Sequence, residues 1–263
     1  MATPVTPQRG NDGTVGKALE VLDQVAEYGR PVRFGELLAA SSHPKATLYR
    51  LIQTLTNQGM LCFDEVQQTY SPGLRLVRLA HAAWRQSSLA PVARPYLDAL
   101  SAEVGETIHL GQLDRGQVLY VDKRNARTPI EMFSQAGKIG PGYCTGVGKA
   151  MIAHLEGDAR EDAIRRQAFF RHTEHTLSDE AAFRAELDVI RSEGIAFDRE
   201  EHEPGIICIA APILSSKGRV MGGMSITSST ERQSLEGLTA LRPQLLKTVT
   251  DIAEAAESWQ FPT

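Results

Sequence analysis

Apolar residues recur at helical spacing in the first sixty residues of the chain and predict three helices. The first covers residues 14–29 and stops at a glycine, which is a good C-terminal cap. The second is short and carries Leu37 and Leu38. The third begins at Pro44, because the first turn of a helix accepts proline, and runs to Gly59.

The third predicted helix has two different faces. Its inward face carries Leu48, Leu51, Ile52 and Leu55, at the spacing of a buried stripe. Its outward face carries Lys45, Ala46, Tyr49, Arg50, Gln53 and Asn57. Cations, a phenol hydroxyl and amides are the groups that hold phosphates and read base edges in the major groove of DNA. The alternative interpretation is an ordinary solvated face of some other small helical domain.

Two short apolar strands follow this helix and predict a hairpin. Residues 60–63 and 69–71 flank the polar turn 64–68. A hairpin directly after a helix-turn-helix is a wing, so the segment is predicted to be a winged helix that binds DNA. The predicted DNA-contact residues are Arg33, Lys45, Ala46, Thr47, Tyr49, Arg50, Gln53 and Gln67.

A fourth helical pattern precedes Pro91. Its apolar stripe is formed by Leu76, Leu79, Ala80, Ala83 and Trp84. A helix between two domains must bury such a stripe, either against a partner subunit or against its own C-terminal domain. The sequence leaves these two alternatives open.

The remaining residues alternate between strand and helix patterns. We expect a helix from Pro95, two strands of a hairpin around residues 114–116, a third strand at Ile130–Gln135 and a helix at Lys149–Leu155. A helix at 179–194, strands at Ile206–Leu214 and Val220–Thr227, and C-terminal helices complete the pattern. This order predicts an α+β fold with a mostly antiparallel sheet and flanking helices.

Charge divides unevenly along the chain. The net charge is −4, but residues 1–90 hold nine Lys/Arg against seven Asp/Glu, whereas residues 91–263 hold nineteen against twenty-five. Any anionic polymer is therefore expected at the N-terminal part. Three cysteines without a CxxC pair favour reduced thiols, and no apolar run approaches the ~20 residues of a membrane span, so a cytoplasmic protein is expected. Residues 1–13 lack the apolar core of a secretory signal and read as a disordered tail.

The glycine-rich stretch at residues 139–155 is the best candidate for a small-molecule site. It is not a phosphate-binding P-loop, because Tyr143 replaces a required glycine and Ala150 replaces the hydroxyl residue that would hold magnesium. The amides of residues 146–148 at a helix start would suit a small carboxylate or phosphate. The alternative is that these glycines only form a tight turn.

No catalytic, metal or cofactor site is expected. Cys144 lies near a helix start, but nothing local supplies a base. His172 and His175 resemble half of a metal site that would need a third ligand such as His202. Redox sensing through Cys144 or Cys208 stays open as an alternative.

Several motifs together resemble the IclR family of transcription regulators. They are PKATLYRLIQTLTNQGML in the N-terminal part, and GETIHLGQLDRGQVLYVDK, CTGVGKAMIAHL, FDREEHEPGIICIAAPI and GRVMGGMSIT in the C-terminal part. The resemblance implies a winged helix-turn-helix domain at 14–76, a linker and dimerisation helix at 77–90 and a GAF-like effector-binding domain at 91–263. Two positions depart from the family pattern, Ala46 in place of a serine and Ile207 in place of a frequent arginine.

The resemblance also implies a function. We expect a ligand-responsive regulator of catabolic or metabolic genes, with repression as the expected mode. Its partners would be a palindromic operator in double-stranded DNA and a small organic acid, and the protein would form a homodimer or a pair of dimers. The expected effector residues are Met132, Gly146, Val147, Asp198, Ile206, Cys208, Met224, Ser225 and Thr227. The alternative is a small-molecule-binding enzyme or storage protein whose N-terminal domain makes only protein contacts.

Overall fold

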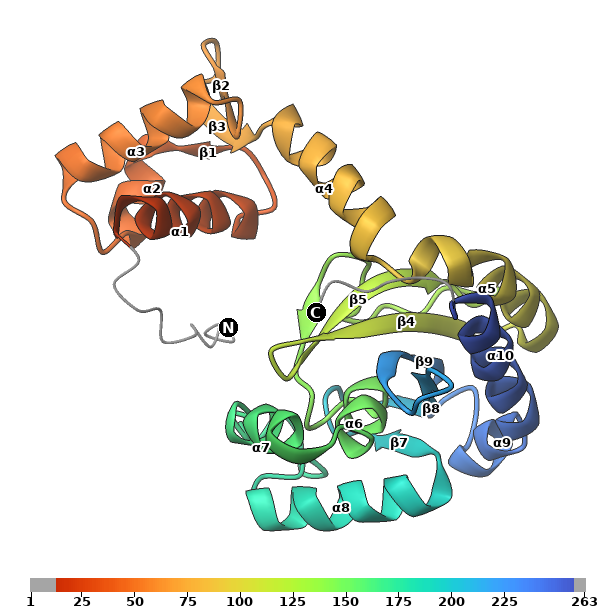
Figure 1. Cartoon of the computed structure of the whole chain (residues 1–263). Helices are drawn as coiled ribbons and strands as arrows, with labels where there is room; N and C mark the ends of the chain where they lie inside the picture. Colours follow the sequence, from red (N-terminus) through yellow and green to blue (C-terminus); the bar gives the residue numbers. More distant parts are fainter. Residues whose placement is uncertain (1–12, 258–263) are drawn as a thin grey trace. The chain divides into compact units, whose positions relative to one another are not determined.

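The computed structural model describes residues 13–257, except for the side chains of residues 85–87. The predicted tail at 1–13 lies outside the described residues, apart from Gly13, which is the first residue of helix α1. The chain divides between Arg85 and Gln86 into two compact units (Figure 1).

The first unit has the three helices and the hairpin that the sequence predicts. Its elements are α1 (Gly13–Glu27), β1 (Val32–Arg33), α2 (Phe34–Ala40), α3 (Lys45–Asn57), β2 (Leu61–Asp64), β3 (Thr69–Pro72) and α4 (Leu74–Ser87). The strands form an antiparallel sheet in the order β1-β3-β2. Strand β1 was not predicted, since two residues are too short for a period-2 pattern. The predicted inward stripe of α3 is confirmed, and all four of its residues are buried in the core of this unit.

The helix that follows starts earlier than the sequence suggests. The expected start at Pro95 is wrong, because α5 covers Ala90–Val104 and contains Pro95. Pro91 lies in the first turn of α5, where the missing N–H has no intrahelical partner to lose. The proline therefore begins this helix instead of separating two elements.

The second unit is built on a six-stranded antiparallel sheet in the order β6-β5-β4-β9-β8-β7. Its strands are β4 (Thr107–Asp114), β5 (Gln117–Arg124), β6 (Ile139–Gly140), β7 (Ala196–Arg199), β8 (Ile206–Leu214) and β9 (Val220–Ser229). The predicted strands β4, β5, β8 and β9 are confirmed, and the short edge strand β7 was missed.

The strand predicted at Ile130–Gln135 is wrong. This segment is a loop, and the edge of the sheet is β6, a few residues later. Side chains rather than a neighbouring strand satisfy its backbone. The Phe133 N–H donates to both carboxylate oxygens of Glu203 at 3.1 and 3.0 Å, and the Lys123 Nζ donates to the Ser134 carbonyl at 2.8 Å.

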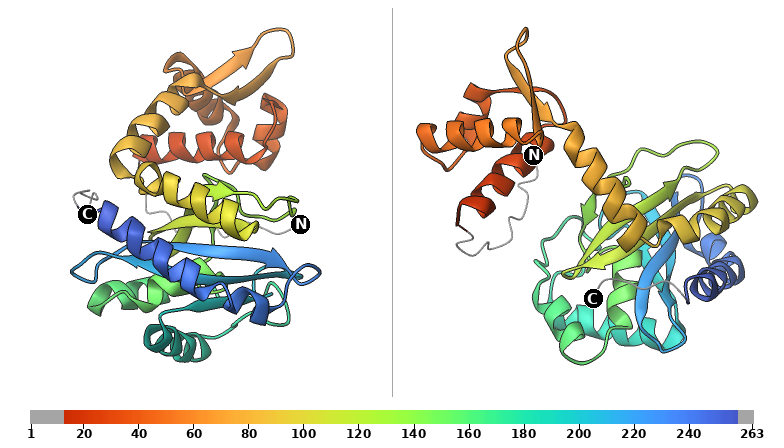
Figure 2. Two further views of the ribbon diagram at one scale, coloured as in Figure 1. Left: turned by 90° about the vertical axis from the view of Figure 1, so that its right-hand side faces the viewer. Right: turned by 45° about the horizontal axis from the view of Figure 1, so that its top comes forward.

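Helices cover both faces of this sheet. Helices α5 and α10 (Arg242–Ala255) contact each other and the strands β4, β5, β8 and β9, and α9 (Leu235–Thr239) contacts β8. Helix α6 (Gly146–Ala153) contacts the other face, and α7 (Gly157–Arg165) and α8 (Glu180–Glu193) pack on α6 (Figure 2). The predicted α+β class is therefore confirmed. Helix α6 begins three residues before the expected Lys149, so Gly146–Gly148 are its first turn.

Candidate functional sites

The outward face of α3 presents cations that nothing in its own unit neutralises. Lys45, Ala46, Tyr49 and Arg50 are exposed. Among residues 13–257, no ion pair or hydrogen bond engages the side chain of Lys45 or Arg50. Other cations of the unit are engaged, since Arg30 pairs with Glu36 at 2.6 Å and Arg75 donates to Gln58. Two free cations on one helix face are available for phosphates.

Two predicted contact residues also hold the unit together. The Tyr49 ring lies edge-on to Phe34, with ring centroids 5.9 Å apart. The half-buried Gln53 side chain lies beside Tyr70 of β3. Gln53 is thus placed where α3 meets the wing.

The wing has an ordered tip. The Asp64 Oδ1 accepts hydrogen bonds from the backbone N–H groups of Val66 and Gln67, at 2.8 and 2.9 Å. Gln67 is exposed, as expected, and the neighbouring Val66 is 93% exposed. An apolar side chain held at the tip of a wing was not among the predicted contacts, because a single valine in a polar turn carries no pattern. Arg33 lies at the start of α2 and is exposed.

A row of polar side chains crosses the sheet on the side that α6 covers, which we call the α6 face. Asp198 on β7 is opposite Cys208 on β8, and Cys208 is opposite Thr227 on β9. Residues directly opposite each other share a face. In the next row, Ser225 is opposite His109 on β4. All five side chains are buried.

Three of these side chains, His109, Ser225 and Thr227, join Ser134 of a neighbouring loop in what we call the hydroxyl–imidazole cluster. The His109 Nδ1 lies 3.2 Å from both the Ser225 and the Thr227 hydroxyl, and its Nε2 lies 2.7 Å from the Ser134 hydroxyl. Burial, with a smaller effect of Lys123, lowers the pKa of His109 to about 3. The ring is therefore neutral, so one nitrogen donates and the other accepts.

The loop at residues 125–138 closes this cluster. It contributes Ser134. Its backbone donates to Glu203 through the Phe133 N–H and accepts from Lys123 at the Ser134 carbonyl. The buried Met132 lies two residues before Ser134 in the same loop.

Glycines allow α6 to approach the sheet. A Cβ on Gly146 would lie 2.5 Å from the Cys208 Sγ and 3.3 Å from the Ala210 Cβ. A Cβ on Gly223 would lie 3.2 Å from a methyl group of Val147, so a side chain on that strand would push the helix away. The N-terminal turn of α6 thus lies directly over Cys208.

A buried ion pair lies beside this site. Lys149 is fully buried, and its Nζ lies 2.5 Å from Glu201 and 3.3 Å from Glu186. The Asp198 Oδ1 accepts a hydrogen bond from the Glu201 N–H at 2.8 Å. Burial and then the neighbouring Glu201 charge raise the pKa of Asp198 to about 8. Asp198 is thus largely protonated at neutral pH.

The two cysteines near the α6 face, Cys144 and Cys208, are buried and not poised to react. Burial is the main reason that the pKa values of Cys144 and Cys208 lie well above the ordinary value, with a further increase from Asp198. A reactive thiol needs a lowered pKa and partial exposure. This disfavours the alternatives of a nucleophile or a redox sensor.

The structure brings together six of the nine predicted effector residues at or beneath the start of α6: Gly146, Val147, Asp198, Cys208, Ser225 and Thr227. Ile206 begins β8 on the same face as Cys208. Met224 lies between Gly223 and Ser225 and faces the opposite side of the sheet, so it is not part of this site. The sequence did not single out His109, Ser134 or Glu201, whose roles depend on long-range contacts.

The histidines do not form a metal site. The rings of His172 and His202 are 4.9 Å apart and edge-on, and the exposed His175 lies beside Glu174. Within residues 13–257, no group of three or more His, Cys, Asp or Glu side chains is placed to hold a metal ion. The helices of that same part of the chain include none with the length and apolar character of a membrane span.

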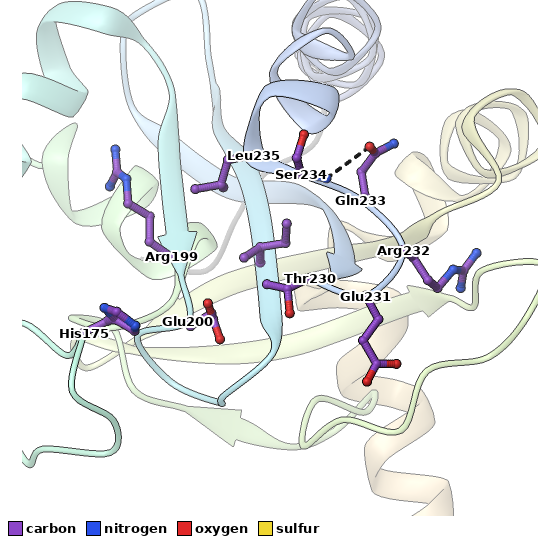
Figure 3. Close-up of a pocket in the computed structure, with 10 residues that line it drawn as sticks. His175, Arg199, Glu200, Thr230, Glu231, Arg232, Gln233, Ser234 and Leu235 are labelled. Carbon is purple, nitrogen blue, oxygen red and sulfur yellow. Dashed lines mark hydrogen bonds between the residues drawn. The ribbon is translucent and has the colours of Figure 1, made fainter.

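A pocket of about 610 Å³ lies elsewhere on the second unit, at the β7 edge of the sheet (Figure 3). It is lined by Arg199, Glu200, Ile207, Arg232 and neighbours from residues 230–235. Its cations are partly engaged, since Arg199 bonds Glu186 at 3.0 Å and Arg232 donates to the Thr128 carbonyl at 2.7 Å. Ile207 faces away from Cys208, so this open pocket is distinct from the closed polar site under α6.

Comparison with known proteins places both units in one family. Residues 14–65 match the IclR helix-turn-helix domain, and residues 81–254 match the bacterial transcriptional regulator IclR C-terminal domain. The transcriptional regulator KdgR of Escherichia coli is 32% identical over 225 residues, covering 86% of this chain and 85% of its own length. BhcR of Paracoccus denitrificans is 30% identical over 244 residues, covering 93% and 87%. The crystal structure of Thermotoga maritima IclR shares the fold, with a TM-score of 0.74 at 24% identity over 93% of this chain and 98% of that one.

Proposed function

This chain belongs to the IclR family of transcriptional regulators, and on that basis we propose that it is a cytoplasmic repressor of catabolic genes that releases its operator when a small organic acid binds. Membership in the family makes it a DNA-binding transcriptional regulator with an effector-binding C-terminal domain, and not an enzyme. Beyond family membership, we propose three features: the kind of operator, the acid effector, and repression as the mode of regulation.

The observation that carries the DNA-binding proposal is the outward face of α3, with Lys45 and Arg50 exposed and unpaired. A helix with this face fits the major groove, where Arg and Lys contact phosphates and guanine edges. The exposed residues of the wing, Gln67 and Val66, are proposed to contact the adjacent backbone and groove. Ala46 cannot donate a hydroxyl hydrogen bond to a phosphate, so the phosphate contacts would come from its neighbours on α3.

Selection from a pool of randomised DNA duplexes tests this proposal. The wild-type protein should enrich an inverted repeat with half-sites one helical turn or a multiple apart. Arg50→Ala should enrich none, whereas Lys217→Ala, which removes one positive charge from an exposed position of the other unit, should enrich the same repeat. Equal enrichment by wild type and Arg50→Ala would contradict the assignment of α3.

The effector is proposed to bind between the start of α6 and the polar row of the α6 face. The contacts would come from Gly146, Val147, Asp198, Cys208, Ser225 and Thr227, with Ile206 and Met132 as apolar neighbours. The buried hydroxyls and the helix amides support a carboxylate ligand, since both can donate hydrogen bonds to it. In this structure the members of the hydroxyl–imidazole cluster are hydrogen-bonded to one another. A ligand must therefore replace some of those hydrogen bonds.

Thermal unfolding against a panel of small organic, sugar and aromatic acids tests the effector proposal. An acid at ~100 times its dissociation constant should add ~2.7 kcal/mol to the free energy of unfolding. Ser225→Ala should weaken this effect, whereas Ser216→Ala, at an exposed position of the hairpin that joins β8 and β9, should not. An unchanged response of Ser225→Ala would move the site elsewhere.

Helix α4 is proposed to pair with a second copy of the chain. Leu74, Val77 and Leu79 are 86%, 65% and 46% exposed on this helix, and apolar surface of this kind favours association. A dimer would present two recognition helices to a palindromic site. Val77→Glu should lower the molar mass measured by light scattering, and an unchanged mass would contradict this interface.

A further inference from the structure

The effector site is unusual in the charges that surround it. Asp198 lies at one end of the polar row and is almost completely buried. The titratable and charged groups around it are Glu201 and Glu203 after β7, Lys149 on α6, Cys144 just before α6, Cys208 on β8, Tyr120 on β5, and beyond them His109 and Lys123. Two of these groups are cations and three, including Asp198, are carboxyl groups.

Neither cation forms an ion pair with Asp198. The Lys149 ammonium lies 2.5 Å from Glu201 and 3.3 Å from Glu186, so it is already paired with carboxylates. The Lys123 ammonium donates a hydrogen bond to the Ser134 carbonyl at 2.8 Å and interacts electrostatically with Glu203. His109 is neutral. A bound carboxylate next to an ionised Asp198 would therefore place two like charges side by side in a buried site, where the nearby Lys149 is already shared by two other carboxylates, and this is unfavourable.

A proton on Asp198 removes this conflict. An ionised carboxylate can only accept hydrogen bonds, whereas a carboxylic acid also donates one. One oxygen of Asp198 already accepts the Glu201 N–H, which leaves the other oxygen to carry the proton. A neutral carboxyl group can then donate a short, charge-assisted hydrogen bond to an anionic ligand.

We propose that Asp198 binds the effector as a neutral carboxylic acid, so that binding of an acid effector is coupled to one proton. This inference rests on the proposed function, in which the effector is a small carboxylate. The balance is simple: the effector enters as an anion, and Asp198 keeps its proton or, where it is ionised, takes one from solvent. Burial and the Glu201 charge already favour the protonated state in the free protein, since they raise the pKa of Asp198 to about 8.

The coupling has a defined pH range. Below about pH 7.5, Asp198 already carries its proton, so the affinity for an anionic effector should change little with pH. Above about pH 8, the proton must be taken up on binding, so the dissociation constant should rise, approaching tenfold for each pH unit. The operator-bound regulator would therefore respond less to its effector as the pH rises.

The experiment uses the full-length protein and three probe acids, pyruvate, gluconate and benzoate. The dissociation constant of each is measured by isothermal titration calorimetry from pH 6.5 to 9.5, and at pH 9 in buffers of different ionisation enthalpy to count protons. Wild type should take up close to one proton per acid at pH 9 and little at pH 6.5. Asp198→Asn, which keeps the acceptor for the Glu201 N–H and has a permanent donor, should show a pH-independent dissociation constant and no uptake.

Glu231→Gln is the matched control, because it removes a carboxylate at an exposed position of the edge pocket. It should keep the pH dependence of wild type. Binding without proton uptake at pH 9, or an unchanged pH dependence in Asp198→Asn, would overturn the inference alone. Failure of all three acids to bind wild type and Asp198→Asn at every pH would overturn the acid-effector assignment, and the inference with it.

Discussion

The two units of this protein carry their functional groups in opposite ways. The winged-helix unit points Lys45 and Arg50 outward and leaves them unpaired. The effector unit buries its polar groups, and His109, Ser225 and Thr227 bond one another. A surface that binds a polyanion can be preformed in water, whereas a buried site must satisfy its polar groups until a ligand replaces them. Substitutions of Lys45 or Arg50 should therefore affect binding alone, whereas substitutions in the buried polar site should affect folding as well as binding.

The largest effect is expected at Lys149. Lys149→Met leaves Glu201 buried without its cation, which should cost about 3–5 kcal/mol of unfolding free energy. Denaturant unfolding measures this loss. Lys217→Met, at an exposed position, should cost less than about 0.5 kcal/mol. Adding Glu201→Gln to Lys149→Met should restore part of the stability, and no recovery would show that packing rather than charge is decisive.

Asp198→Asn should raise the unfolding free energy, in contrast to Lys149→Met. An acid whose pKa is higher in the folded protein binds more protons there than in the unfolded chain, so wild-type stability falls as pH rises between the two pKa values. The window runs from about pH 4 to about pH 8, and the loss is up to about 1.4 kcal/mol per pH unit. Asp198→Asn avoids this loss, so its stability advantage should grow across the window and stay constant above it. A constant difference between pH 4 and 8 in thermal unfolding would contradict a raised pKa.

Arg50→Ala tests the outward-facing unit. Loss of one contact to a phosphate or base costs about 1–3 kcal/mol of binding free energy, and the proposed dimer would lose it twice. Fluorescence anisotropy on the selected operator should show this weakening, while the unfolding free energy stays within about 0.5 kcal/mol of wild type. A comparable loss of stability would remove the contrast between the two units.

Gly146→Ala should give a smaller effect in the effector unit. The new Cβ would lie 2.5 Å from the Cys208 Sγ, and such overpacking costs about 1–3 kcal/mol. Adding Cys208→Ala removes the colliding sulfur, so a double-mutant cycle should show a favourable coupling between the two changes. Additive losses would mean that α6 does not rest on Cys208 as the structure shows.

The contrast also explains how much the sequence could predict. The inward stripe of α3 and the hairpin strands follow periodic patterns, and the structure confirms them. The strand predicted at Ile130–Gln135 is a loop, because Glu203, seventy residues away, binds its backbone. The sequence did not indicate a role for His109 for the same reason, since its hydrogen-bond partners Ser225 and Thr227 lie on a strand distant in the sequence. Periodicity reports which face of an element is apolar, and it does not report which distant polar groups meet.

We propose that a small acid bound in the effector unit controls the affinity of the winged-helix unit for DNA. The most direct measurement is the affinity of wild-type protein for the selected operator, by fluorescence anisotropy, with and without the acid that gives the largest thermal shift. We expect at least a fivefold weaker operator affinity with the acid present, and no change in Ser225→Ala at the same acid concentration. An acid that stabilises the protein and leaves operator affinity unchanged would contradict it.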